Sequence, residues 1–414
     1  MLLSVLNTFP GILWLPSRSI YIFIKALLRL AFVIVNNIYC IPTYCIWMLL
    51  ILPLKKYHPA LYWRIEGFFF HWLLSMVTLW SWSAGYHIVE MGDDIRHCLE
   101  DRTLVLVNHQ STGDVPMMMA TLNPKPKVLP SVMWIMDYVF KFTNFGIVSV
   151  VHEDHFILSG KSQRDQGILL LRKHLRESYL PLKRKLMVLF PEGGFLRKRK
   201  ETSQRYAIKN NLPHLEHVTI PRMGAIRAIM DELATHKEES EQPTANNNKF
   251  GSDFEYRGAK LAKRYHDPLS FSDTGCIKDP NSPMKDPNED VLSWILDITI
   301  GYPGGRPIDL SHIIFGHRDP CQTFLYYRLY HLSEVPKEEE AFSKWLLDRW
   351  VEKETMLEQF YTSGEFPQKS SAYLIPPRPV TQNNLRFLLL HLFFMLSSYV
   401  HYIIISFIIS KING

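Results

Sequence analysis

Cysteine is scarce and scattered in this chain of 414 residues. The five cysteines are Cys40, Cys45, Cys98, Cys276 and Cys321. Their number is odd, no C-x-x-C pair occurs, and two of them fall in one long apolar stretch, so a disulfide framework and a cysteine metal site are both excluded. No Asn-x-Ser/Thr glycosylation sequon occurs either. We therefore expect the polar part of the chain to face a reducing compartment.

A large excess of one charge is also missing, because the formal net charge is only +6. Neither zinc-finger spacing nor a repeat of basic and aromatic residues occurs, so no nucleic-acid partner is expected. The positive charge is concentrated in Lys55–Lys56 and in the cluster Arg197–Lys200. A cluster of this kind is ordinarily a solvated face, but beside membrane segments it favours an anionic lipid surface.

Charged residues are nearly absent from the two ends of the chain. The stretch Ser19–Leu54 is apolar except for Lys25, Arg29 and the pair Asn36–Asn37. It exceeds the roughly 20 residues that one membrane span needs, and predicts either a tilted span after an interfacial helix or a hairpin that turns at the asparagines. The uncharged run Phe387–Ser410 predicts a C-terminal transmembrane helix.

A third stretch without formal charge, Phe68–Tyr86, is rich in Trp and Phe. It is compatible with a membrane segment, with a helix lying in the interface, or with a buried core helix. The N-terminus lacks a short apolar core followed by a small-residue cleavage site, so we interpret it as an uncleaved anchor rather than a secretory signal.

Strand-like and helix-like segments alternate after Tyr86. The expected strands are His87–Glu90, Thr103–Val107, Lys127–Met133, Gly146–Val151, Lys185–Phe190, His217–Pro221 and Phe324–Leu332. The expected helices are Trp134–Phe145, Arg164–Tyr179, Ala225–Leu233 and Ala341–Phe360. This alternation predicts an α/β domain with a largely parallel sheet, in which ligands gather at the carboxyl ends of the strands. Residues 236–290 are polar and rich in Asn and Pro, which predicts a flexible insertion.

Two polar motifs follow buried strands. The first places His109 and Asp114 between the strand Thr103–Val107 and an apolar helix. A histidine there can take a proton at neutral pH, and the aspartate can reach it only if the helix begins between them. The alternative is an ordinary turn histidine beside an N-cap aspartate. The second motif ends the strand Lys185–Phe190 with Pro-Glu192-Gly193.

Two other chemistries are disfavoured by pattern. A serine hydrolase is not indicated, because no G-x-S-x-G elbow occurs. The run His152-Glu-Asp-His155 is not H-E-x-x-H, and strand-like neighbours put its two histidines on opposite faces, so no metal site is expected.

The motifs together resemble the glycerolipid acyltransferase family, membrane enzymes that acylate lysophospholipids from acyl-CoA. Asn108-His109 through Asp114 is similar to the first family block, N-H-x-x-x-x-D. Phe190–Gly193 is similar to the third block, F-P-E-G, although Gly194 then replaces the usual Thr or Ser. Val218–Pro221 is similar to the fourth block, V-x-I-P. The run Phe-Pro-Glu-Gly-Gly-Phe-Leu-Arg-Lys-Arg makes the branch that acylates lysophosphatidylglycerol the most similar one.

The second block departs from the family pattern. Only Gly146 fits it, while Ser149 and His152 occupy the slots in which the family carries Phe and Arg. The family uses that Arg to contact the acceptor phosphate. The resemblance leaves this role here to Arg164, Arg197 or Arg222, with no basis in the sequence for choosing among them.

The resemblance implies an activity and its partners. Acyl-CoA is a co-substrate, no cofactor or metal is needed, and the acceptor is a lysophospholipid, lysophosphatidylglycerol or lysophosphatidylethanolamine. His109 and Asp114 are the catalytic residues it implies. Glu192 and Gly193 would bind the glycerol part of the acceptor. Alternatives are a 1-acylglycerol-3-phosphate or monoacylglycerol acyltransferase, or a catalytically silent lipid-binding relative.

These expectations divide the chain into three parts. Residues 1–90 are membrane-anchoring helices, 91–380 an acyltransferase domain containing the insertion, and 381–414 a transmembrane helix. The implied location is the endoplasmic reticulum membrane, with the active site on the cytosolic side.

Overall fold

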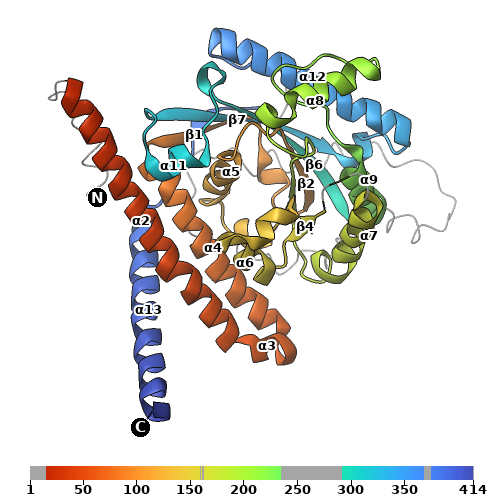
Figure 1. Cartoon of the computed structure of the whole chain (residues 1–414). Coiled ribbons are helices and arrows are strands. Elements are labelled where there is room, and N and C mark those ends of the chain that lie inside the picture. The colour runs from red at the N-terminus through yellow and green to blue at the C-terminus, as the bar shows by residue number, and fades with distance from the viewer. Residues whose placement is uncertain (1–14, 159, 161–162, 235–290, 368–373, 414) are drawn as a thin grey trace.

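An eight-stranded sheet forms the centre of the protein in a computed structural model that describes residues 15–158, 160, 163–234, 291–367 and 374–413 (Figure 1). Its strand order is β4-β3-β5-β2-β6-β7-β1-β8. The strands are β1 (Tyr86–Asp93), β2 (Arg102–Val107), β3 (Val132–Asp137), β4 (His155–Ile157), β5 (Leu186–Leu189), β6 (Leu292–Gly301), β7 (Cys321–His331) and β8 (Leu374–Pro379). Only the β6–β7 and β1–β8 pairs are antiparallel, so the predicted α/β class with a largely parallel sheet is confirmed.

Helices cover both faces of this sheet. The long ones are α2 (Leu15–Leu50), α4 (Pro59–Ser83), α8 (Leu196–Lys209), α12 (Glu339–Ser363) and α13 (Asn384–Asn413). The shorter ones are α3 (Leu52–Tyr57), α5 (Asp114–Leu122), α6 (Asn144–Val151), α7 (Arg164–His174), α9 (Met223–Ala234) and α11 (Leu310–Phe315). Single turns of 3-10 or π helix are η1 (Ile95–His97), η2 (Leu129–Ser131), η3 (Tyr138–Phe142), η5 (Leu175–Tyr179), η7 (Pro303–Gly305) and η8 (Leu332–Glu334).

Strand β2 lies between β5 and β6 and is buried along its whole length. Its side chains alternate between the two faces, as the period of a strand requires. Val105 and Val107 belong to the core cluster that includes α4 and α5, whereas Leu104 and Leu106 belong to the cluster that includes α7, α9 and α12. This double burial explains why the strand is apolar throughout, and it brings the residues after Val107 to the carboxyl edge of the sheet.

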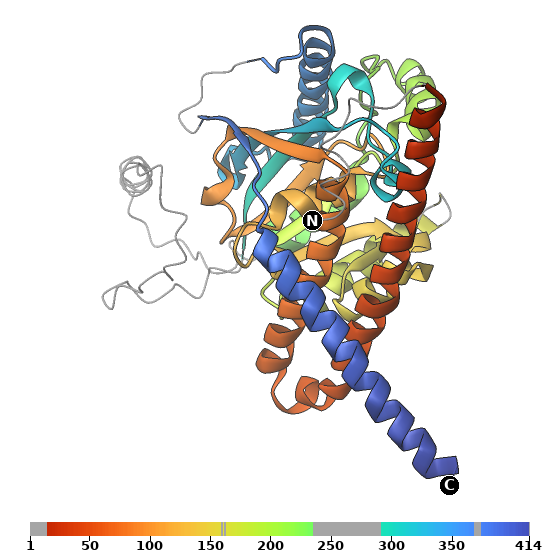
Figure 2. The same cartoon turned by 90° about the vertical axis from the view of Figure 1, so that its left-hand side faces the viewer.

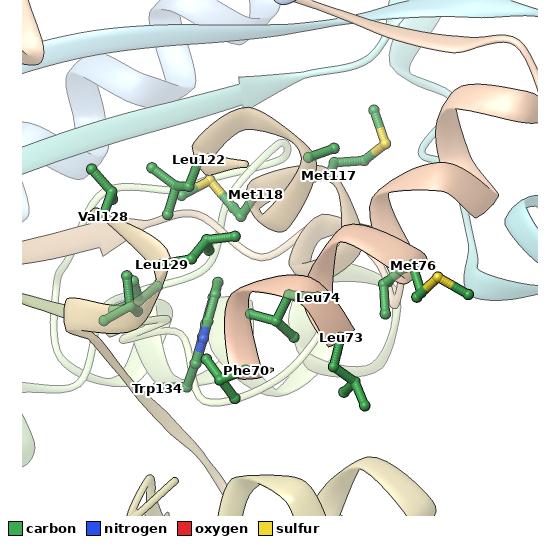
Figure 3. Close-up of a cluster of buried hydrophobic side chains, with 14 of the residues drawn as sticks. Phe70, Leu73, Leu74, Met76, Met117, Met118, Leu122, Val128, Leu129 and Trp134 are labelled. Atoms are coloured by element: carbon green, nitrogen blue, oxygen red, sulfur yellow. The ribbon is translucent and has the colours of Figure 1, made fainter. Parts of the chain in front are cut away.

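Helix α4 is a core helix. Its Phe70, Leu73 and Leu74 are each about as buried as the centre of the sheet, at 1% exposure, and they pack near Met118 of α5 and Trp134 of β3 (Figure 3). Among the interpretations of Phe68–Tyr86, the structure supports the buried core helix.

Helix α2 is one uninterrupted helix, so the predicted hairpin at Asn36–Asn37 is wrong. Both amides are satisfied without a turn, because Trp80 Nε1 donates to Asn36 Oδ1 at 3.1 Å and Asn37 Nδ2 donates to the Val33 carbonyl at 2.8 Å. The chain reverses later, at α3, and returns as α4.

Two helices within the described residues are long and apolar enough to cross a membrane, by length and composition: Ser19–Leu50 and Asn384–Ile412. Thr43 and Ser398 hydrogen-bond across them at 2.7 Å. The end of α13 extends beyond the rest of the described chain (Figure 2). These helices indicate membrane association, whereas the insertion predicted at 236–290 lies outside the described residues.

Four predicted segments differ from the structure. Gly146–Val151 is helical, within α6, because the Thr143 hydroxyl accepts from the Gly146 amide at 3.0 Å and caps a helix that β-branched residues alone do not predict. The strand expected at Lys127–Met133 begins only at Val132, so Trp134–Phe145 divides between β3, η3 and the start of α6. His217–Pro221 is an irregular segment whose amides bind side chains instead of a neighbouring strand.

The burial of α4 gives a stability prediction. Leu74→Ala removes a side chain that is 1% exposed, and should lower the free energy of unfolding by about 2–5 kcal/mol. The matched control Leu61→Ala removes a side chain of the same helix that is 45% exposed, and should change it by less than about 0.5 kcal/mol. Thermal unfolding of the two variants in detergent micelles compares them. Equal destabilisation by both substitutions would contradict the assignment of α4 to the core.

Candidate active site

His109 and Asp114 meet where β2 ends and α5 begins. Helix α5 starts at Asp114 itself, so the helix begins between the two residues and the carboxylate reaches back to the ring. His109 Nδ1 lies 2.8 Å from Asp114 Oδ2. The Asp114 side chain has no exposure, while the His109 side chain is 12% exposed. One nitrogen of the ring is therefore held inside the protein on a carboxylate.

The Asp114 carboxylate is fully engaged by donors. Its Oδ2 also accepts from the amides of Gln110 at 2.7 Å and Ser111 at 2.9 Å, and its Oδ1 accepts from the Tyr302 hydroxyl at 2.6 Å. Burial and the charge of Asp114 raise the pKa of Tyr302 well above its ordinary value, so this hydroxyl keeps its proton. Since Oδ2 acts as an acceptor, His109 carries a proton on Nδ1 and has Nε2 as its basic nitrogen.

The second motif surrounds His109 from the other side. Phe190 lies 4.3 Å from the His109 ring, centroid to centroid, and Phe195 lies 4.6 Å away edge-on. The Leu196 amide donates to the His109 carbonyl at 2.8 Å, and the His109 amide donates to Glu192 Oε1 at 3.1 Å. The structure thus brings the two motifs of the sequence together around one imidazole.

Glu192 is buried, at 2% exposure, and both of its oxygens accept from protein donors. Besides the His109 amide, these are the amide and hydroxyl of Thr219, at 3.2 and 2.9 Å, and Trp350 Nε1 at 3.4 Å. Burial raises the pKa of Glu192 to about 8, against the opposing effect of these hydrogen bonds. In the structure the carboxyl group of Glu192 connects three segments of the protein. The contact with the acceptor that the resemblance implies for Glu192 stays a prediction.

Helix α12 supports the same region with a second carboxylate. Glu354 accepts from three consecutive amides, those of Glu216 at 2.7 Å, His217 at 2.8 Å and Val218 at 3.1 Å. The Gln110 side chain donates to the His217 carbonyl at 2.7 Å. Residues 216–219 are therefore held between α12 and the turn that carries His109, without belonging to the sheet.

Gly193 and Gly194 have φ angles of +69° and +153°, which residues other than glycine rarely adopt. A Cβ on Gly193 would lie 2.9 Å from the Arg222 guanidinium, and one on Gly194 would lie 2.8 Å from Arg199 Nε. Arg199 also donates to the Gly193 carbonyl at 2.8 Å. The two glycines thus let two guanidinium groups lie directly against the backbone after Glu192.

Arg164, Arg199 and Arg222 form a group that we call the arginine triad. Burial, then the charge of Arg199, then that of Arg164, lower the pKa of Arg222. Arg164 lies against Gly224, two positions after Arg222 in the chain, at 3.6 Å from the position of a Cβ there. No carboxylate among the described residues is paired with any of the three. Three like charges gathered without a counter-charge are a place where an anion would be stabilised.

The basic cluster Arg197–Lys200 does not act as one free patch. Arg197 is ion-paired with Asp309 of the α11 N-cap, at 2.8 Å. Lys200 is ion-paired with Glu216, and Lys198 lies over the Phe195 ring. Of the four cations, only Arg199 contacts the glycines after Glu192. Proximity to Glu192 in the sequence did not distinguish Arg199 from the other three.

Gly146 and His152 make packing contacts in the structure, and the substrate-binding role expected for Gly146 stays a prediction. A Cβ on Gly146 would lie 2.1 Å from the Phe140 carbonyl oxygen, so glycine is needed for α6 to pack against η3. His152 is buried, bonds to Glu66 at 2.9 Å and stacks on Phe70. No hydrogen bond among the described residues connects Gly146 with the network of His109 and Glu192.

Several residues of the site were missed by sequence reasoning. Tyr302, Trp350 and Glu354 were not considered, whereas Thr219 and Arg199 lie within stretches that the sequence analysis named without singling them out. Tyr302 follows β6, and because β6 pairs with β2 in parallel, the two strands end side by side. The position of Tyr302 directly after a strand could have identified it as a site residue. That step requires the strand order, which the sequence does not reveal.

Comparisons with known proteins bear on the family of the chain. Residues 312–390 match the family model described as acyltransferase C-terminus. The chain is 42% identical over 387 residues to the acyl-CoA:lysophosphatidylglycerol acyltransferase 1 of Homo sapiens, covering 94% of this chain and 95% of that protein. It is 26% identical to a putative 1-acyl-sn-glycerol-3-phosphate acyltransferase, acl-12, of Caenorhabditis elegans, covering 92% and 86%.

Among solved structures, the 1-acyl-sn-glycerophosphate acyltransferase PlsC of Thermotoga maritima is similar at 11% identity and a TM-score of 0.31, over 77% of this chain and 97% of that one. The human relative, by its identity and coverage, is sufficient to assign the family. The chain belongs to the glycerolipid acyltransferase family and is a homologue of its acyl-CoA:lysophospholipid acyltransferases.

Proposed function

We propose that the protein transfers an acyl group from acyl-CoA to the free hydroxyl of a lysophospholipid, with His109 as general base. The observation that carries this proposal is the His109–Asp114 pair at the carboxyl edge of a parallel sheet, with Nδ1 bound 2.8 Å from a buried carboxylate. That arrangement orients the ring and fixes the neutral tautomer whose lone pair is on Nε2, as a general base requires.

The reaction needs no covalent intermediate on the enzyme. His109 Nε2 takes the proton of the acceptor hydroxyl while its oxygen attacks the thioester carbonyl carbon. The tetrahedral intermediate then releases the CoA thiolate, which receives the proton from the imidazolium. Asp114 stabilises the imidazolium through the Nδ1 hydrogen bond. Because a thiolate is a good leaving group, one base is enough for both steps.

We propose that the arginine triad binds the acceptor phosphate. Guanidinium groups suit phosphate because they donate several hydrogen bonds in one plane. The triad offers this charge near Glu192, in a chain whose second block lacks the Arg of the family pattern. Together with the similarity to a lysophosphatidylglycerol acyltransferase, this favours lysophosphatidylglycerol as acceptor, with lysophosphatidylethanolamine or 1-acylglycerol-3-phosphate as alternatives.

The reaction would take place at a bilayer, since the acceptor is a lipid and the chain has two helices with the length and composition of membrane spans. We propose the endoplasmic reticulum membrane, with the site on its cytosolic side, where acyl-CoA is present. The absence of disulfide spacing and of glycosylation sequons is consistent with that side.

The catalytic pair can be tested in membranes. His109→Ala should lower the rate of acyl transfer by about 10²–10⁴. Asp114→Asn should also be severely impaired while it folds normally, because an amide can keep the hydrogen bonds to Gln110 and Tyr302 but cannot stabilise an imidazolium. Rates at matched protein abundance, with a panel of lysophospholipids and acyl-CoAs, measure the effect. Normal turnover by His109→Ala would mean that another residue catalyses the transfer. No turnover by the unsubstituted protein would indicate a catalytically silent relative.

The role of Glu192 can be separated from acceptor binding. In Glu192→Gln, an amide nitrogen replaces one of two carboxyl oxygens that both accept hydrogen bonds. Because an amide nitrogen cannot accept, the change displaces His109 or Thr219. We expect kcat to fall about 10-fold or more, while KM for the acceptor changes little. The opposite result, a raised KM for the acceptor with kcat unchanged, would mean that Glu192 binds the acceptor directly.

The triad is tested by its dependence on the head group. Arg164→Gln and Arg222→Gln should each raise KM for lysophosphatidylglycerol several-fold, and affect an uncharged monoacylglycerol much less. Arg205→Gln, on an exposed side of α8, is the matched control, and Arg197→Gln reports whether the cation paired with Asp309 shares the role. Assays in detergent micelles remove any effect of bilayer docking. Equal losses with charged and uncharged acceptors would exclude phosphate recognition by the triad.

A further inference from the structure

The turn η3 and the first part of α6 expose an unusual amount of apolar surface. Val139 is 71% exposed and Phe142 is 77% exposed. We call the following residues the η3–α6 patch: Tyr138, Val139, Phe140, Phe142, Ile147 and Val150. Exposed apolar side chains are common singly, but six within thirteen positions of one local segment indicate a surface that something covers.

The backbone of the patch is satisfied within the segment itself. The Asp137 carboxylate accepts from the Val139 amide at 3.0 Å, and the Thr143 amide donates to the Phe140 carbonyl at 3.0 Å. The Thr143 hydroxyl donates to the same carbonyl at 2.7 Å and accepts from the Gly146 amide at 3.0 Å. A turn that enters an apolar medium must satisfy its polar groups internally, because an unbonded one costs several kcal/mol.

The patch adjoins the apolar surface of α2. Asn144, at the start of α6, donates to Asn37 of α2 at 2.8 Å. A shallow groove of about 390 Å³ lies along α2 and is lined by Ile34, Asn37, Ile38, Ile41, Pro42 and, from α6, Asn144. Ile34 and Ile38 of this lining are exposed, at 47% and 66%. The segment that carries the patch therefore lies beside an exposed apolar part of α2, a helix that has membrane-like length and composition.

We propose that the η3–α6 patch inserts into the interfacial region of the lipid bilayer beside α2, as a membrane contact additional to α2 and α13. The aromatic residues suit that region, where rings are enriched at the level of the head groups. Lys141 lies between Phe140 and Phe142 and is exposed, with its ammonium group 5.6 Å from the Tyr138 ring centroid. Its stem can pass along the apolar side chains while its charge meets lipid phosphates.

Gly146 has a defined part in this arrangement. A Cβ would lie 2.1 Å from the Phe140 carbonyl and 2.5 Å from the Lys141 carbonyl, so only glycine lets α6 support the turn from beneath. The segment in which the second family block departs from its pattern is thus the segment that carries the patch. The inference depends on this geometry and not on the chemistry proposed for His109.

Photo-crosslinking in native membranes tests the contact. A photoreactive phenylalanine analogue at Phe142 should crosslink phospholipid about as well as the same analogue at Ile38 of α2. The control position is Ile208 of α8, which is 72% exposed and outside the patch, and which should give little lipid adduct. Lipid yields at Phe142 no higher than at Ile208 would overturn the proposal. A product formed only with protein, whether another copy of the chain or a different partner, would overturn it as well.

A second measurement does not depend on the analogue. The double variant Val139→Gln, Phe142→Gln should lower acyl transfer to an acceptor in anionic phospholipid vesicles several-fold, and leave the rate in detergent micelles unchanged. The exposed pair Tyr206→Gln, Ile208→Gln is the matched control and should change neither rate. An equal loss in vesicles and micelles would contradict a bilayer contact. Failure of His109→Ala to lose activity would refute the catalytic proposal and leave this comparison unaffected.

Discussion

The burial of the Asp114 carboxylate is the constraint around which the site is built. A carboxylate without exposure must be matched by donors, since each missing hydrogen bond to a buried charged group costs about 1–3 kcal/mol or more. Five donors meet it: His109 Nδ1, two amides of the turn after β2, the Ser111 hydroxyl, and the Tyr302 hydroxyl at the end of β6. These hydrogen bonds to Asp114 connect two neighbouring strands with the start of α5, and one of them also fixes the orientation of the imidazole.

A second buried carboxyl group extends the same logic outward. Glu192 joins the His109 amide to Thr219 and Trp350, and Glu354 of the same helix as Trp350 captures the amides before Thr219. Helix α12, more than 200 positions from His109 in the chain, therefore helps to hold the base through two carboxyl groups. Burial raises the pKa of Glu192 to about 8 and outweighs its hydrogen bonds, which act in the opposite direction.

The surroundings of this core divide into a charged side and an apolar side. The arginine triad gathers where Gly193 and Gly194 leave room for guanidinium groups against the backbone. The η3–α6 patch gathers where Gly146 leaves room for a tightly packed turn beside α2. An enzyme acting on an anionic amphiphile needs both surfaces, one for the head group and one for the layer in which the acyl chain resides. Glycine is needed at both surfaces, because a Cβ at Gly193, Gly194 or Gly146 would lie too close to a guanidinium group or a backbone carbonyl.

The sequence by itself determined the α/β class, the buried strand β2, the helices α7, α9 and α12, and the pairing of His109 with Asp114, because local periodicity and motif spacing carry that information. It also identified both long apolar helices at the ends. It misread Gly146–Val151 as a strand, since one capping hydroxyl decided the helix, and it misread His217–Pro221, whose partners are carboxylates from distant segments. Tyr302, the burial of α4, and the difference between Arg197 and Arg222 were decided only by the tertiary structure. Each depends on a tertiary contact: which strand ends beside β2, what packs against α4, or which arginine has a carboxylate beside it. Such contacts join positions too far apart in the chain for any local pattern to specify.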